Sequence, residues 1–278
     1  MDKYPALPAF LDALGLTEGP MGMHYTDLEP SGGVSPRPQA PLSREAEAAG
    51  AVDWQSVQDN FSCVLGVVWR ARKKQAAAYF SRERFGCPGA AFYLGFMRPY
   101  LAMHPPFIST GIPGLLEGER YAASHEAAVR FFDSIDPRPA PASYCVIKPL
   151  GHFIDDEPEV VIFFCRPESL SGLYALAAFL TGDIDAVRAP FGPGCSGLVT
   201  WPVRYAAGGR PTAVLGGFDP SCRLYLKTDE LTFAVSTAFF LDMLDRWDSS
   251  FLSRPTWAKV KKRVARSART WGEAAGEK

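Results

Sequence analysis

The chain has 278 residues, of which 47% are hydrophobic, 21% charged and 13% aromatic. These proportions exclude a disordered, collagen-like or coiled-coil protein, because they let a sizeable apolar core be buried. With 29 Lys and Arg against 30 Asp and Glu, the net charge is −1, so the whole chain has no attraction for nucleic acid or an anionic membrane. Composition therefore indicates an ordinary globular protein and leaves open whether it is an enzyme.

The N-terminal segment lacks the basic region followed by an apolar run that a secretory signal carries. The longest apolar stretch, around residues 173–180, is far shorter than a bilayer span. Six cysteines are too dilute for a disulfide scaffold, and no CxxC pair occurs. We therefore expect a cytoplasmic protein with free thiols and no membrane partner.

The first part of the chain predicts two helices, a loop and a strand. Residues 5–15 place apolar side chains along one helical face and end in Gly15, a helix stop signal. Residues 28–43 are rich in Pro and Gly and predict a surface loop. A helix with a basic C-terminal end is expected over 54–74, followed directly by a strand over 76–81.

A Phe-Gly-Cys-Pro-Gly turn at 85–89 precedes an expected helix over 90–97. Pro88 fits the first position of a helix, where its missing N–H is not needed, so Cys87 would be the N-cap. A long Pro- and Gly-containing loop is expected over 104–120.

The second part of the chain alternates expected helices and strands. They are a helix over 122–134, strands over 144–150 and 160–165, a helix from Pro167, a brief helix over 196–205, strands over 212–215 and 231–236, and a helix over 237–246. This order predicts an α+β (mixed α/β) fold with helices packed on a mixed sheet, forming a single globular domain over residues 1–253.

The C-terminal segment, residues 254–278, is strongly basic. It holds eight Lys or Arg and two Glu, a local charge of +6 that leaves −7 on the preceding residues. A helix over 256–271 would carry one apolar stripe, composed of Trp257, Val260, Val264, Ala268 and Trp271. We expect a solvated basic face on a helix docked by its tryptophans. Binding to nucleic acid or acidic lipid is the less favoured alternative, since no RNA-binding motif accompanies the helix.

One short pattern occurs twice in the chain. Gly86-Cys87-Pro88-Gly89 resembles Gly194-Cys195-Ser196-Gly197, 108 residues later, and apolar residues follow both. The repetition predicts two loosely duplicated halves, about 50–100 and 160–210, related by a pseudo-twofold axis. A cleft would then lie between the two turns, with the two cysteines facing it.

A thiol at a helix N-terminus is favoured as a thiolate, because unpaired N–H groups and the helix dipole stabilise negative charge there. Cys87 and Cys195 are therefore the candidate catalytic cysteines. The flanking glycines allow a ligand to approach the backbone and are candidate ligand-binding residues: Gly86, Gly89, Gly194 and Gly197. The alternative is that both cysteines are structural and lie on tight turns.

Cys63 and Cys222 lie at similar distances in sequence from the two turns. Together with Cys87 and Cys195 they form a candidate four-thiolate site for zinc or an iron–sulfur cluster, although the four come singly and not in CxxC pairs. Cys145 and Cys165 lie in apolar strand runs and are expected in the core.

Several segments resemble an uncharacterised prokaryotic family catalogued as domain of unknown function 169. They are Cys63 to Gly66, Tyr79 to Ser81, Phe85 to Ala90, Leu94 to Phe96, Lys148 to Leu150, Pro158 to Pro167, Gly194 to Gly197 and Asp229 to Leu231. The resemblance spans about residues 5–245 and implies a soluble cytoplasmic bacterial or archaeal protein. Because the family has no established reaction, it implies no catalytic residue. The Pro-rich segment at 28–43 and the basic terminal helix depart from its pattern.

These observations support two main hypotheses about function. The first is a cysteine-dependent redox or iron–sulfur protein with a cleft between the two turns. The second is a binding or sensory module without catalysis, in which the glycine-rich turns hold a small anion or carboxylate and Arg223 supplies positive charge. An interaction protein acting through the basic helix comes third, and the oligomeric state stays open.

Overall fold

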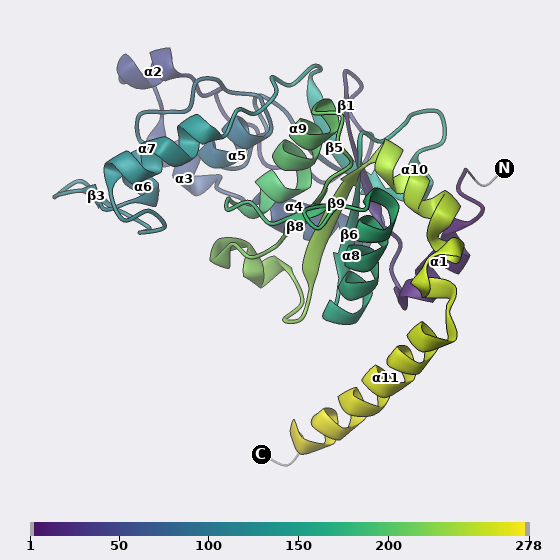
Figure 1. The fold of residues 1–278 in the computed structure, drawn as a ribbon. Coiled ribbons are helices and arrows are strands. Elements are labelled where there is room, and N and C mark those ends of the chain that lie inside the picture. Colours follow the sequence, from purple (N-terminus) through teal and green to yellow (C-terminus); the bar gives the residue numbers. More distant parts are fainter. Residues whose placement is uncertain (1–2, 276–278) are drawn as a thin grey trace.

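A seven-stranded mixed sheet forms the centre of residues 3–275, the part of the chain that the computed structural model describes. Its strand order is β2-β5-β1-β6-β9-β8-β7, and neighbours are antiparallel except for the parallel pair β7 and β8. The strands are β1 (Met21–Thr26), β2 (Ala78–Phe80), β5 (Tyr144–Pro149), β6 (Val160–Cys165), β7 (Val187–Arg188), β8 (Ala213–Gly216) and β9 (Leu231–Ser236). The expected α+β fold with helices on a mixed sheet is confirmed (Figure 1).

Helices cover both faces of the sheet, so the central strand β6 is buried throughout. Its residues alternate: Val161 and Phe163 join one core cluster, whereas Val160 and Ile162 join the other. The first core contains α1 (Leu7–Leu14), α8 (Pro167–Thr181) and α10 (Thr237–Arg246). The second contains α4 (Val64–Lys74), α5 (Pro88–Tyr93), α9 (Trp201–Ala207) and the π-helical segment η2 (Ser196–Thr200).

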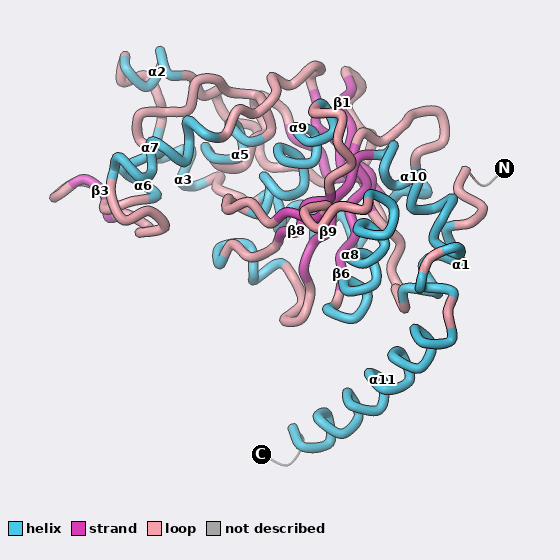
Figure 2. The backbone as a smooth tube through the Cα atoms, viewed as in Figure 1, coloured by secondary structure: helices cyan, strands magenta, loops and turns pink. Residues whose placement is uncertain are grey.

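A lobe beside the second core carries shorter elements and long loops (Figure 2). It holds α2 (Arg44–Ala48), α3 (Trp54–Asp59), α6 (His104–Ile108), α7 (His125–Ser134) and the hairpin β3 (Gly111–Ile112) and β4 (Leu116–Glu117). The segment 104–120 is therefore more structured than the loop that the sequence predicts. Four short 3-10 helices complete the described elements: η1 (Leu150–His152), η3 (Pro220–Tyr225), η4 (Trp247–Ser249) and η5 (Phe251–Ser253).

The single helix predicted over 54–74 is wrong. The chain breaks between α3 and α4 because the Asn60 side chain donates a hydrogen bond to the Ser56 carbonyl (2.9 Å) and Asn60 leaves helical geometry. Cys63 consequently lies at the N-cap of α4 and not inside a helix. The break places a thiol at a helix N-terminus.

Residues 28–43 form the irregular segment that their composition predicts, and this segment contacts the edge of the sheet. Val34 forms an isolated bridge with Ala78 of the edge strand β2. Its N–H donates to the Ala77 carbonyl (2.7 Å), and its carbonyl accepts from the Tyr79 N–H (3.0 Å). The segment therefore runs along the outer side of β2.

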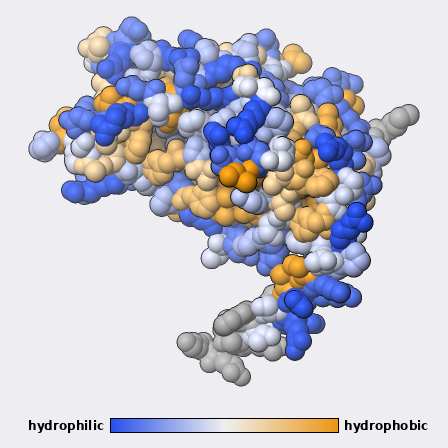
Figure 3. Space-filling model, viewed as in Figure 1, coloured by the Kyte–Doolittle hydropathy of each residue, from blue (hydrophilic) through white to orange (hydrophobic). Residues whose placement is uncertain are grey.

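Helix α11 (Pro255–Ala275) projects away from the body (Figure 1) and has a largely hydrophilic surface where its side chains are coloured (Figure 3). At its start, Trp257 is buried, and its indole N–H donates to the Ala13 carbonyl (2.8 Å). The side chains of Ala268 and Trp271, part of the predicted stripe, lie outside the described residues. Among the described residues, none of the helices combines the length and the apolar character needed to cross a bilayer.

Candidate functional site

Four cysteines lie at or near the N-termini of four separate helical segments. Cys63 is the N-cap of α4, and Cys87 is the N-cap of α5, where its Sγ accepts a hydrogen bond from the Ala90 N–H (3.3 Å). The prediction that Cys87 caps a helix is confirmed. Cys195 directly precedes η2, and Cys222 lies in the first turn of η3. Each thiol is therefore near backbone N–H groups that a helix leaves unpaired.

Tertiary packing brings these segments together. The Ser62 N–H donates to the Gly86 carbonyl (3.0 Å), which joins the turn before α4 to the turn before α5. The Thr200 hydroxyl of η2 donates to the Tyr93 carbonyl at the end of α5 (2.7 Å). Gly194 lies so close to η3 that a Cβ atom there would be 3.0 Å from the Cys222 sulfur. The four cysteines thus lie around one locus.

Asp219 lies near all four of these cysteines. Burial is the main cause of the raised pKa values of four thiols and two tyrosine hydroxyls, and the negative charge of Asp219 raises each of them further: Cys63, Cys87, Cys195, Cys222, Tyr93 and Tyr121. The Asp219 carboxylate accepts hydrogen bonds from the Gly194 N–H (3.3 Å), the Ser221 N–H (3.2 Å) and the Ser221 hydroxyl (2.7 Å). These bonds fix the carboxylate between the loops before η2 and η3.

Burial keeps the thiols protonated, contrary to the predicted thiolates. It raises the pKa of Cys87 to about 12, although hydrogen bonds from the Ala90 and Gly89 N–H groups lower that pKa. Burial also raises the pKa of Cys222 to about 12 and the pKa values of Cys63 and Cys195. The helix N-termini are thus too weak to offset desolvation by themselves.

Within the described residues, no three His, Cys, Asp or Glu side chains are placed to ligate one metal ion. All six cysteines are free thiols. A single ion binds sulfur at roughly 2.3 Å, so its ligands must converge closely. The four thiols are neighbours without having this spacing.

The two Gly-Cys-x-Gly turns differ in conformation. Gly86 has φ +81°, and Cys87 is extended, whereas Cys195 has helical angles. A Cβ on Gly86 would lie 2.5 Å from the Ser62 carbonyl oxygen, so this glycine is required by close packing. Gly89 has nothing within 3.9 Å of such an atom. The duplication of two halves stays a prediction.

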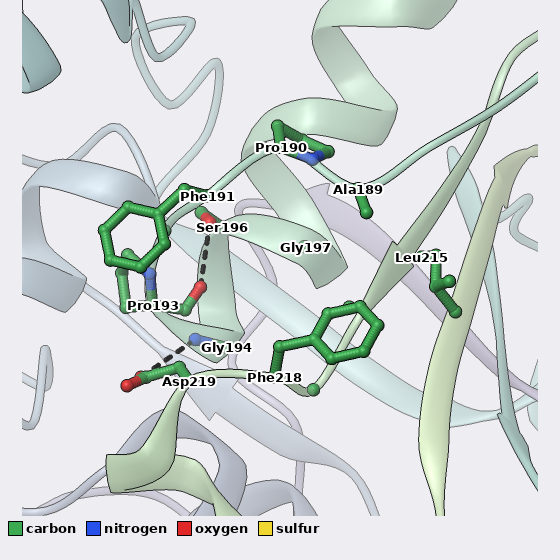
Figure 4. A pocket seen from close by; sticks show the side chains of 13 residues that line it. Ala189, Pro190, Phe191, Pro193, Gly194, Ser196, Gly197, Leu215, Phe218 and Asp219 are labelled. Atoms are coloured by element: carbon green, nitrogen blue, oxygen red, sulfur yellow. Dashed lines mark hydrogen bonds between the residues drawn. The ribbon is translucent and has the colours of Figure 1, made fainter. Parts of the chain in front are cut away.

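A pocket of about 220 Å³ opens beside the thiols (Figure 4). Its walls are formed by the loop before η2 and by the loop from β8 to η3: Ala189, Pro190, Phe191, Gly192, Pro193, Gly194, Ser196, Gly197, Leu215, Gly216, Gly217, Phe218 and Asp219. Gly194 and Gly197 therefore line it, whereas Gly86 and Gly89 do not, and a role of these glycines in ligand binding stays a prediction. The pocket lies at the second turn and not between the two turns.

Arg223 does not face this pocket as a free cation. Its guanidinium donates hydrogen bonds to four backbone carbonyls, those of Gly217 (3.0 Å), Glu230 (2.6 Å), Lys227 (3.0 Å) and Thr228 (2.9 Å). Arg223 therefore holds the loop between η3 and β9 in shape. Because the guanidinium makes these four hydrogen bonds, the geometry does not support the predicted role of Arg223 in ligand binding.

Four residues near the site are not among those that the sequence predicts: Asp219, Tyr93, Phe191 and Phe218. Asp219 could have been found, because it precedes Pro220 as a helix N-cap and lies three residues before Cys222. Tyr93 and Phe191 carry no such signal, since only packing brings them to the site. Cys145 and Cys165 are buried in strands β5 and β6, as predicted.

Comparison with known proteins gives one result. The model of the DUF169 family, described as uncharacterised ArCR, matches residues 9–246. This match confirms the resemblance found in the sequence. No curated protein and no solved structure gives a significant match.

Proposed function

The chain belongs to the DUF169 family, and because that family supplies no reaction, we propose from the residues themselves that Cys63, Cys87, Cys195 and Cys222 bind an iron–sulfur cluster. The observation that carries the proposal is the convergence of four thiols, from four helical segments, around Asp219. Under this proposal, Cys87 and Cys195 act as ligands and not as nucleophiles.

The charges at this site favour the binding of a positively charged group such as iron. Four thiols and a carboxylate repel one another as anions, and the raised pKa values reflect part of that repulsion. Bound iron would reverse it, since metal binding displaces the thiol protons. The helix N-termini at Cys63 and Cys87 would then stabilise the net negative charge of a thiolate-ligated cluster.

We favour a cluster over a single ion for these four thiols. A tetrahedral zinc site with bonds of roughly 2.3 Å needs sulfur atoms within about 4 Å of one another. A cluster spreads its ligands over several iron atoms, so its cysteines lie farther apart.

The test is anaerobic purification of the full chain, followed by absorption spectroscopy and iron, zinc and sulfide analysis. We expect a broad absorption band at about 400 nm, and iron and sulfide in equal amounts. The amount of bound iron should fall in each of four variants: Cys63→Ser, Cys87→Ser, Cys195→Ser and Cys222→Ser. It should not fall in Cys165→Ala, which replaces a buried cysteine in β6. Zinc without sulfide, or full iron in every variant, would contradict the proposal.

A second candidate function is a small-molecule binding or sensory module without catalysis. The pocket at the loop before η2 favours it, because the walls leave an open volume of about 220 Å³. It shares Gly194 and Asp219 with the thiol site, so one protein can combine both functions.

We also infer a cytoplasmic location. Six free cysteines are typical of a reducing compartment. Mass spectrometry of the protein alkylated inside cells would test this inference, since disulfide-linked peptides would contradict it.

A further inference from the structure

The lining of the pocket beside the thiols carries a negative charge. Of the thirteen residues that form its walls in the described chain, Asp219 is the one with an ionisable side chain. The other walls are glycine backbone, two prolines and apolar side chains, with the hydroxyl of Ser196 already donated to the Pro193 carbonyl (2.8 Å). Asp219 therefore supplies the negative charge of the lining, while the Arg223 guanidinium is bonded to the carbonyl of the lining residue Gly217 (3.0 Å).

The negative charge of the lining opposes the anion or carboxylate ligand that the glycine-rich turn suggests in sequence. The Gly194 N–H, which such a ligand would need, already donates to Asp219 Oδ2. An incoming anion would have to displace that carboxylate and then lie beside it. The geometry thus favours a cationic ligand and not the anionic ligand that the sequence suggests.

Two aromatic rings add a second preference. Phe191 and Phe218 come from the two loops that form the pocket, and Figure 4 shows both beside Gly194 and Asp219. They are 58% and 55% exposed, which is unusual for phenylalanine. Phe191 is held by contacts with Phe131 (ring centroids 5.6 Å apart) and Tyr121 (6.3 Å). A ligand that binds to its exposed side would therefore cost little side-chain entropy.

We propose that this pocket binds a small planar cation, namely an amidinium carried on an aromatic ring. The ring packs against Phe191 and Phe218, and the cationic group interacts with Asp219 and with the aromatic faces. The volume accommodates a single substituted ring. The proposal specifies the ligand class of the second candidate function and does not require a cluster.

Three probes of equal shape test the sign of the preferred charge: benzamidine, benzamide and benzoate, which are cationic, neutral and anionic at neutral pH. Calorimetric titration or ligand-observed NMR on the full chain gives their affinities. We expect benzamidine to bind about tenfold more tightly than benzamide and benzoate to bind most weakly. Equal affinities, or tighter binding of benzoate, would overturn the proposal.

Variants then locate the binding site. Asp219→Asn should abolish the preference for benzamidine over benzamide, whereas Asp245→Asn, an exposed aspartate on α10, should preserve it. Because Asp219 also joins two loops, Phe218→Ala serves as an independent variant that removes only an exposed ring. It should weaken benzamidine binding, unlike Phe179→Ala on α8. Unchanged binding in Phe218→Ala would contradict the proposed site.

One further variant separates this proposal from the cluster. Cys63→Ser removes a proposed iron ligand that does not line the pocket. We expect it to lose iron and to keep the preference for benzamidine. If the wild type binds iron but shows no preference for benzamidine over benzamide, the pocket proposal is rejected and the cluster proposal is unaffected.

Discussion

The Gly194 N–H donates to Asp219 Oδ2 across the two loops that carry Cys195 and Cys222. This bond links the thiol site to the pocket, because Gly194 and Asp219 also line the pocket. A ligand that moves Asp219 would therefore change the surroundings of all four cysteines. The proposed thiol site and the pocket therefore share one carboxylate.

The first prediction distinguishes the two glycines of the second turn. A Cβ on Gly194 would lie 2.7 Å from Leu65 and 3.0 Å from Cys222, so Gly194→Ala should lower the free energy of unfolding by about 1–3 kcal/mol. Gly197 has its nearest neighbour at 3.5 Å, the Gly216 Cα. Gly197→Ala should leave stability unchanged or raise it by up to about 1 kcal/mol. Urea unfolding of both variants measures the difference, and equal effects would contradict it.

A second prediction concerns Arg223. Its guanidinium binds four carbonyls, so Arg223→Ala should lower the free energy of unfolding by about 2 kcal/mol. Arg223→Lys should recover little of this, since an ammonium cannot reproduce the planar arrangement of donors. Urea unfolding measures both. A ligand-binding role would instead give variants of normal stability.

The third prediction is a pH dependence that arises from His104. Its ring stacks on Phe132 (centroids 5.3 Å apart), both ring nitrogens are buried without a hydrogen-bond partner among the described residues, and burial lowers its pKa to about 4. An unfolded chain takes up the proton near pH 6.5, so stability should fall between about pH 6.5 and 4, by about 3 kcal/mol at most. Unfolding measured across this range should show the loss.

Replacing this histidine isolates its contribution. His104→Phe keeps the stacking and removes the titration, so the variant should be about as stable as the wild type at pH 7 and lose less stability at pH 5. His125→Gln, at an exposed position on α7, is the matched control. An unchanged pH profile in His104→Phe would show that other groups cause the loss.

The fourth prediction concerns the attachment of α11. Trp257 is buried, contacts Phe251 edge-on (5.0 Å) and donates to the Ala13 carbonyl. Trp257→Ala should lower the free energy of unfolding by about 3–5 kcal/mol and free the helix from α1. Limited proteolysis should then cut near residue 254 faster than in the wild type. Val260→Ala, on the same helix and 39% exposed, should change neither quantity.

Two strands and one helix have the bounds that the sequence predicts, and the helix is α10 (Thr237–Arg246). The strands over 160–165 and 231–236 were predicted with their observed bounds, because apolar and aromatic runs mark buried strands. Strand β1 was missed, since Met21 to Thr26 has little β-branched character. The break before Cys63 was also missed, although Asn60 and Ser62 interrupt the helical pattern.

The site was less predictable than the fold. A local rule identified the N-cap at Cys87, and the cysteines were selected by residue type and spacing. The place of Asp219 near the cysteines and the bonds made by Arg223 depend on tertiary packing, which no local pattern encodes. Because Asp219 lines the pocket and Arg223 is bonded to backbone carbonyls, the proposed cationic ligand is the opposite of the anion that the glycine-rich turns suggest in sequence.

The contact of Val34 with β2 has a consequence for self-association. An uncovered sheet edge offers free N–H and C=O groups to a strand of another molecule. Here the segment around Val34 occupies those groups on one edge, and the opposite edge strand, β7, has two residues and exposes the charged Arg188. Both edges are thus poor templates for intermolecular β-pairing, which protects an otherwise apolar sheet from aggregation.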